Sequence, residues 1–104
     1  MTAEQEKAIY REASARYGLQ AETLILAEEC SELVKACCKA CRAVQDGNFD
    51  NYENHLMAMA EEIADVKVVI GQMMSYYEIP EEMIERIKIE KLERLKRRME
   101  GLPD

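Results

Sequence analysis

Hydrophobic residues recur at helical spacing in several segments of this chain, and the two longest segments are the most regular. In the segment from about residue 20 to residue 45, the apolar stripe comprises Leu26, Cys30, Leu33, Cys37, Ala40 and Val44. In the segment from about residue 51 to residue 77, it comprises Leu56, Met59, Ile63, Val66, Ile70, Met73 and Tyr77. Alternating steps of three and four residues keep side chains on one face of an α-helix. The pattern therefore predicts two long helices, each with a continuous buried seam.

A shorter helix is predicted before this pair. Thr2 is followed three residues later by Gln5, which fits a capping box at a helix start. The helix should end near Arg16, because Gly18 suits the position just beyond a helix end.

The remaining connections and the last helix are also indicated by turn and capping residues. Turn-forming residues fill positions 46–51, and Asp50 is placed to cap the helix that follows. So short a connection makes the two long helices antiparallel neighbours. Pro80 suits the first turn of a fourth helix that reaches about Met99. We therefore expect one all-α domain of four helices spanning 1–104.

Composition narrows the class of protein. The chain has 104 residues, is 48% hydrophobic and 34% charged, and carries a net charge of −7. No apolar run approaches the roughly 18 residues of a membrane span, and the polar N-terminus does not resemble a signal peptide. The acidic balance disfavours nucleic acid and anionic membranes as partners. We expect a cytoplasmic protein.

Four cysteines, at positions 30, 37, 38 and 41, fall within one predicted helix. The simplest interpretation is that they act as small hydrophobic residues, with Cys30 and Cys37 in the buried seam. Redox or zinc chemistry is an alternative, although a zinc site would need a second ligand cluster and His55 is the only histidine. A disulfide framework is disfavoured, because cysteines on one helix close no long loop.

Acidic residues provide the strongest candidate chemistry. Glu28, Glu29 and Glu32 lie on one long helix, and Glu62 and Asp65 lie on the other. Residues three or four apart share a helix face, so each helix presents a pair of carboxylates. At about 100° per residue, Glu29, Glu32, Glu62 and Asp65 flank the apolar seams on the same side, and Glu28 points further outward. Antiparallel packing would bring the two flanks together, where the like charges need a raised pKa or a cation. Oxygen ligands alone favour Mg²⁺, with Mn²⁺ as a possible substitute.

Two acidic segments in this order resemble a known family. The segments Ala-Glu-Glu-Cys-Ser-Glu-Leu at 27–33 and Glu-Glu-Ile-Ala-Asp-Val at 61–66 resemble the two signature segments of the MazG-like nucleoside triphosphate pyrophosphohydrolases. The tail at 87–95 is similar to the ending of the compact, phage-type members. The similarity extends from about Tyr17 to Arg98.

The resemblance implies a function and an assembly. Such enzymes use Mg²⁺ to cleave the α–β linkage of ribo- or deoxyribonucleoside triphosphates to the monophosphate and pyrophosphate, often to clean the nucleotide pool. It implies a MazG-like four-helix bundle completed by oligomerisation, as a homodimer or a dimer of dimers. The implied metal ligands are Glu29, Glu32, Glu62 and Asp65, with Glu28 as a further ligand or a general base. The alternative from another class is a non-catalytic helical interaction module whose carboxylates hold a structural cation.

Basic residues are weaker candidates for contacts with substrate phosphates. The resemblance favours Lys91 and Arg94 on the last helix, which could reach the site of a neighbouring subunit, and then Lys39 and Arg42 on the second helix. The alternative is that Lys91 and Arg94 only complement the helix dipole or pair with nearby glutamates.

Overall fold

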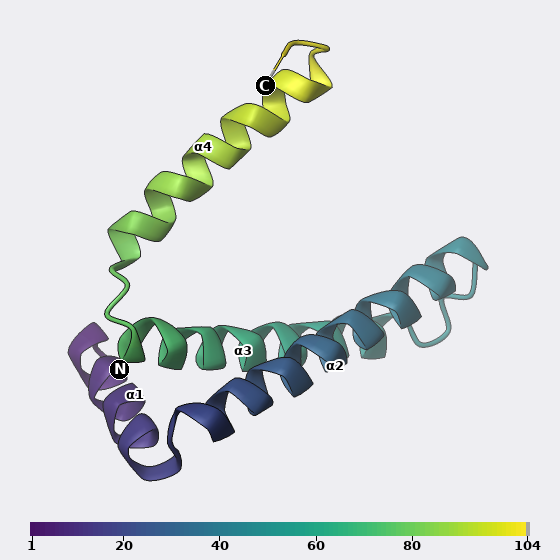
Figure 1. Cartoon of the computed structure of the whole chain (residues 1–104). Helices are drawn as coiled ribbons and strands as arrows, with labels where there is room; N and C mark the ends of the chain where they lie inside the picture. Colours follow the sequence, from purple (N-terminus) through teal and green to yellow (C-terminus); the bar gives the residue numbers. More distant parts are fainter. Residues whose placement is uncertain (104) are drawn as a thin grey trace.

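The chain folds into four α-helices, and the computed structural model contains no strand within residues 1–103, the part of the chain that it describes. In order they are α1 (Ala3–Tyr17), α2 (Leu19–Gln45), α3 (Tyr52–Tyr76) and α4 (Glu81–Met99) (Figure 1). The all-α prediction is confirmed, and each helix lies close to its predicted bounds. Residue 104, the last residue of the predicted domain, lies outside the described part. No helix in that part is long and apolar enough to cross a membrane.

The centre of the molecule is an antiparallel hairpin of α2 and α3 (Figure 1). A stripe of buried and half-buried positions, here called the contact stripe, recurs every three or four residues on both helices. On α2 it comprises Glu22, Leu26, Glu29, Leu33, Ala36, Ala40 and Ala43, and on α3 it comprises His55, Met59, Glu62, Val66, Val69 and Met73. Within residues 1–103, its buried apolar members are Ala40, Val66 and Val69, at 7%, 9% and 5% exposure, whereas Glu22 is only 1% exposed.

The predicted seams were therefore partly wrong. Cys30 and Val44 on α2, and Leu56, Ile63 and Ile70 on α3, are exposed. The contact stripe is rotated by roughly one residue toward the acidic flank of each helix. The apolar arc of each helix is wider than one helix–helix contact, so the hairpin uses only one edge of it.

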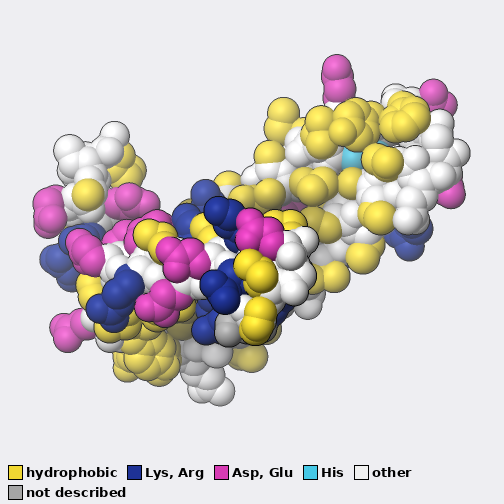
Figure 2. Space-filling view, turned by 90° about the horizontal axis from the view of Figure 1, so that it is seen from above, with side chains coloured by type: hydrophobic (Ala, Val, Ile, Leu, Met, Phe, Trp, Pro, Cys, Tyr) yellow, Lys and Arg dark blue, Asp and Glu magenta, His cyan; other side chains and the backbone are white. Residues whose placement is uncertain are grey.

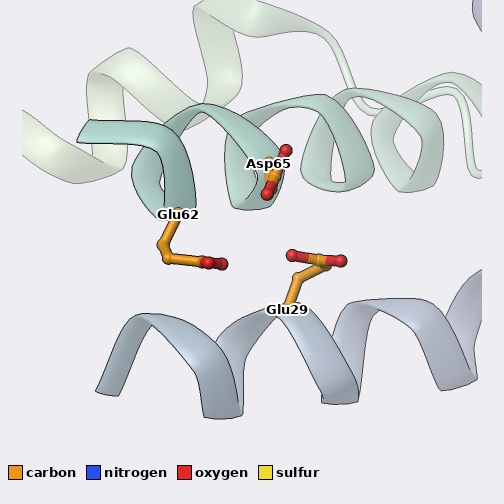
Figure 3. Close-up of side chains that lie close together, drawn as sticks. All are labelled: Glu29, Glu62 and Asp65. Atoms are coloured by element: carbon orange, nitrogen blue, oxygen red, sulfur yellow. The ribbon is translucent and has the colours of Figure 1, made fainter. Parts of the chain in front are cut away.

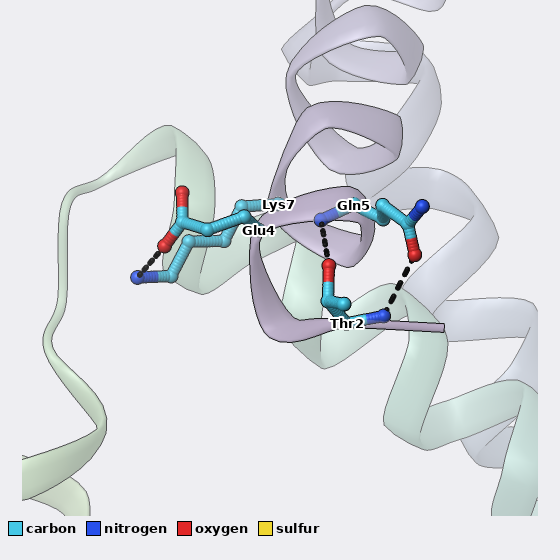
Figure 4. A network of polar contacts seen from close by, with 4 residues as sticks. All are labelled: Thr2, Glu4, Gln5 and Lys7. Atoms are coloured by element: carbon cyan, nitrogen blue, oxygen red, sulfur yellow. Dashed lines mark hydrogen bonds and ion pairs between the residues drawn. The ribbon is translucent and has the colours of Figure 1, made fainter.

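Local sequence signals account for most helix ends. Thr2 and Gln5 form the predicted capping box, with Gln5 N donating to Thr2 Oγ1 at 3.1 Å and Thr2 N donating to Gln5 Oε1 at 2.8 Å (Figure 4). Gly18 alone separates α1 from α2, and its φ of +85° is available to glycine at little cost. The predicted Asp50 cap was wrong, because α3 begins after Asn51 without a side-chain cap.

α1 crosses the open end of the hairpin and contacts both long helices. Against α3, the ring of Tyr10 lies where Gly71 has no side chain, and a Cβ there would come within 2.5 Å of the ring. Against α2, Ser14 Oγ donates to the carboxylate of Glu22 at 3.0–3.2 Å. Glu22 is only 1% exposed, so this contact lies inside the fold.

α4 stands apart from the rest of the chain and packs against none of the other helices among residues 1–103 (Figure 1). At the joint, Glu78 has a φ of 54°, Ile79 N donates to Met74 O at 2.9 Å, and Pro80 precedes the first turn of α4. The radius of gyration is 17.4 Å, whereas a compact chain of this length has about 13 Å. One chain by itself therefore does not close a four-helix bundle.

Candidate metal centre

Three carboxylates meet in the middle of the hairpin. Glu29 extends from α2 toward Glu62 and Asp65 on α3 (Figure 3). Each residue offers an oxygen within 4.8 Å of the oxygens offered by the other two. Glu62 and Asp65 are three residues apart and so share a helix face, while the antiparallel pairing places Glu29 opposite them. The structure thus brings together one residue of the first acidic segment and both of the second.

The convergence arises differently from the prediction. Glu29 and Glu62 lie in the contact stripe itself, rather than beside it, and both are half-buried. Asp65 borders the stripe and is exposed. The site is therefore built into the helix–helix contact and opens to solvent on the side of Asp65.

The local electrostatics disfavour three ionised carboxylates. The pKa of Glu29 is raised above its ordinary value, first by partial removal from water and then by the negative charges of Asp65 and Glu62. A hydrogen bond with Asp65 and the charge of Glu32 raise it further. A raised carboxyl pKa means that the site gains from anything that neutralises it, whether a proton or a cation.

One carboxylate oxygen of the site lacks a hydrogen-bond donor among the described residues. Glu62 Oε2 is fully buried and has no hydrogen-bond donor among the described residues. A buried carboxylate oxygen without a donor is costly. The other buried acid, Glu22, differs because Ser14 satisfies it. A cation placed among the three carboxylates would satisfy Glu62, and an all-oxygen donor set suits a hard divalent ion such as Mg²⁺ or Mn²⁺. The residues present therefore fit such an ion.

The other predicted acidic residues lie outside this group. Glu32 is exposed, although its charge acts on Glu29. Glu28 is also exposed and points further outward, as expected from its position. Both therefore lie at the exposed rim of the site, outside the group of three carboxylates.

The predicted basic residues are not gathered at the carboxylates. Lys39 and Arg42 are exposed on α2. Lys39 follows Glu32 by seven residues, which places it on the same edge of the helix about two turns away. Lys91 and Arg94 lie on α4, which has no contact with the hairpin.

Among residues 1–103, no cysteine belongs to a group of three or more possible ligand residues close enough to share an ion. All four are free thiols, with Cys30, Cys38 and Cys41 exposed and Cys37 half-buried. The prediction that Cys30 lies in a buried seam was wrong. Within residues 1–103, the acidic triad is the one group of three or more acidic, cysteine or histidine side chains close enough to share an ion.

Sequence reasoning missed Glu22. It is as buried as any residue of the hairpin, and it lies one heptad before Glu29 in the contact stripe. Its heptad spacing from Glu29 places it on the same helix face, but that spacing does not show that the acid is buried. Comparisons with known protein families, with curated proteins and with solved structures found no match to this chain.

Proposed function

We propose that this protein is a Mg²⁺-dependent nucleotide pyrophosphohydrolase that converts nucleoside triphosphates, ribo or deoxyribo, to the monophosphate and pyrophosphate. The observation that carries the proposal is the convergence of Glu29, Glu62 and Asp65 around the buried, unpartnered Glu62 Oε2. The two acidic segments that converge are those that resemble the signature segments of MazG-like enzymes. A cation site alone would suit many functions. The resemblance to MazG-like enzymes is what favours hydrolysis of nucleoside triphosphates.

The proposed roles follow from position. Glu29, Glu62 and Asp65 hold the ion, and Glu32 completes its ligands from the next turn of α2. When bound, Mg²⁺ neutralises phosphate charge and lowers the pKa of a coordinated water. Glu28, at the exposed rim, is a further ligand or the base that accepts a proton from the attacking water.

Contacts to the phosphates need positive charge beyond the ion. Lys39 shares an edge of α2 with Glu32, so it is the basic residue of the hairpin best placed for this role. Lys91 and Arg94 are too remote within one chain and could meet phosphate only in an assembly of several copies. We propose that the protein works as a homodimer or a dimer of dimers, in the cytoplasm.

A product assay tests the reaction. Purified protein with Mg²⁺ is given a panel of ribo- and deoxyribonucleoside triphosphates, and monophosphate and pyrophosphate are quantified. We expect equal amounts of both products, and loss of at least about a hundredfold in rate for Glu62→Gln. Glu61→Gln is the matched control, because Glu61 is an exposed neighbour outside the triad.

The outcomes separate an enzyme from a binding module. Release of inorganic phosphate, or equal rates for Glu62→Gln and Glu61→Gln, would contradict the proposal. Stabilisation by Mg²⁺ without turnover of any triphosphate would instead favour a non-catalytic module with a structural cation.

A further inference from the structure

α4 is an amphipathic helix that packs against no other helix among residues 1–103. Its apolar side consists of Ile84, Ile87, Leu92 and Leu95, which line a shallow groove together with Lys88 and Lys91. Each of these apolar residues is substantially exposed. A helix in a protein gains most of its stability when its apolar face packs against another element. α4 lacks such packing here.

The hairpin has an unpartnered surface of its own, here called the apolar face. It comprises Cys30, Val34, Cys41 and Val44 on α2, and Leu56, Ile63 and Ile70 on α3, all exposed. At about 100° per residue, all of them lie on the same rotational side of the contact stripe. Since α2 and α3 are antiparallel, that side of both helices faces one side of the hairpin. Figure 2 shows hydrophobic side chains gathered over the hairpin toward its connecting loop.

The exposed area is larger than one folded chain should have. The accessible surface is 8246 Å², whereas a compact protein of 12.0 kDa exposes about 6000 Å². The excess, roughly 2200 Å², is more than the roughly 800 Å² that each partner loses in an interface of standard size, and is typical of obligate homodimers. Only three apolar residues are buried within residues 1–103, and a core so small could not hold the chain folded alone.

We propose that α4 is an exchanged arm: the α4 helix of each copy docks on the apolar face of a second copy of this chain. The opposite net charges of α4 and the hairpin favour the approach of the two elements, and the apolar side chains then make the contact. α4 carries seven basic and five acidic side chains, whereas residues 19–76 carry four basic and ten acidic ones. Because one chain holds both the arm and its receptor, a two-fold dimer satisfies both at once and closes the assembly.

The joint favours docking on another copy over docking on the same chain. The left-handed conformation at Glu78 and the Ile79–Met74 hydrogen bond direct α4 away from its own hairpin (Figure 1). The rim carboxylates lie on the opposite rotational side of the contact stripe from the apolar face. The exchange therefore leaves the carboxylates accessible and does not depend on the proposed hydrolysis.

The first test compares two substitutions on α4. Leu95 lies in the apolar side of α4 and is 48% exposed, whereas Ile89 lies outside it and is 52% exposed. We expect the wild type and Ile89→Glu to sediment as a dimer, or as a dimer of dimers, at micromolar concentration. Leu95→Glu should weaken the dimer at least about tenfold. A monomeric wild type, or equal effects of the two substitutions, would overturn the proposal.

The second test separates exchange from closure within one chain, and it works even if single variants fold poorly. Leu95→Glu damages the arm, and Ile63→Glu damages the apolar face. In an exchanged dimer, refolding a mixture of the two variants creates a heterodimer with one undamaged arm–face pair, so dimer mass and helicity should recover above either variant alone. In a chain that docks its own arm, every pair stays damaged and mixing restores nothing, which would refute the exchange.

A third measurement distinguishes this proposal from the proposed enzyme. Glu62→Gln should dimerise as the wild type does while losing hydrolysis. Loss of dimerisation by this variant would contradict the separation of the apolar face from the carboxylates. If the mixing test succeeds but the wild type hydrolyses no triphosphate, only the enzymatic proposal is refuted.

Discussion

The contact between Ser14 and Glu22 predicts a large effect from the loss of one hydroxyl group. Glu22 is 1% exposed, and its only hydrogen-bond donor among the described residues is Ser14 Oγ, at 3.0 Å from one carboxylate oxygen and 3.2 Å from the other. Ser14→Ala leaves the buried carboxyl group with no donor. It also loosens the attachment of α1 to the hairpin, because this is the one side-chain hydrogen bond between α1 and α2.

The magnitude follows from two opposing effects. Leaving a buried polar group unsatisfied costs about 1–3 kcal/mol. Replacing serine by alanine within a helix returns about 0.5 kcal/mol. The hydrogen bond outweighs the propensity, so we expect Ser14→Ala to lower the free energy of unfolding by about 1–2 kcal/mol, or the Tm by about 5–15 °C.

Thermal and urea unfolding would measure this loss of stability. The protein concentration is held fixed, because the proposed dimerisation would make Tm depend on concentration. Ser31→Ala is the matched control: Ser31 is exposed in the middle of α2, so the same substitution gains propensity and loses no internal bond. Adding Glu22→Leu to Ser14→Ala should recover stability, since both polar partners are then gone. If Ser14→Ala and Ser31→Ala unfold alike, or if the double variant gains nothing, the reasoning about Glu22 is refuted.

Three further predictions concern the triad and the α1–α3 contact. Because the pKa of Glu29 is raised in the folded state, the folded protein binds a proton at Glu29 more tightly than the unfolded chain does, and this proton binding stabilises the fold. Without divalent ions, the stabilisation is complete below the unfolded-state pKa of Glu29 and is lost as the pH rises through its folded-state pKa. Unfolding measured from pH 4 to 7 should show this loss in the wild type and a smaller one in Glu29→Gln; equal slopes would contradict the assigned cause. At pH 7, Mg²⁺ should raise the Tm of the wild type, with a much smaller rise for Asp65→Asn, and equal rises would place the ion elsewhere. Gly71→Ala should add less to the free energy of unfolding in the wild type than in a Tyr10→Ala background. Without the Tyr10 ring, nothing opposes the gain in helix propensity, about 1 kcal/mol. If the two substitutions were additive in unfolding measurements, the ring would have to move aside freely.

The helices were predictable because their signals are local. Apolar spacing located α2 and α3, and the Thr2–Gln5 capping box and Gly18 marked the ends of α1. The Asp50 cap failed because several polar residues at 46–51 can each begin a helix, and the chain starts α3 after Asn51 without using a side chain. Local chemistry thus identified each element, and it left the finer choice of cap undetermined.

The pairing of α2 with α3 was predictable, but its rotational phase was not. Periodicity finds the apolar arc of a helix, and it does not show which edge of a wide arc meets a partner in the same chain. The expectation that a seam is apolar throughout favoured Cys30 and Ile63, whereas the contact stripe contains Glu29 and Glu62. The carboxylates therefore met more directly than predicted, and Glu22 stayed hidden because nothing in its spacing separates a buried acid from a solvated one.

The rotational phase in which α2 and α3 pair lowers the stability of their contact. Acids at Glu22, Glu29 and Glu62 occupy contact-stripe positions that large apolar side chains would otherwise fill. Among the described residues, the only apolar side chains that the hairpin buries are Ala40, Val66 and Val69. Half-buried like charges and an unpartnered carboxylate oxygen weaken the same contact further. The stabilising burial must then come from elsewhere, and the chain offers it on the other edge of each apolar arc and on α4. The site inside the helix–helix contact and the exposed apolar face, which we propose a second copy covers, are thus two results of one choice of rotational phase.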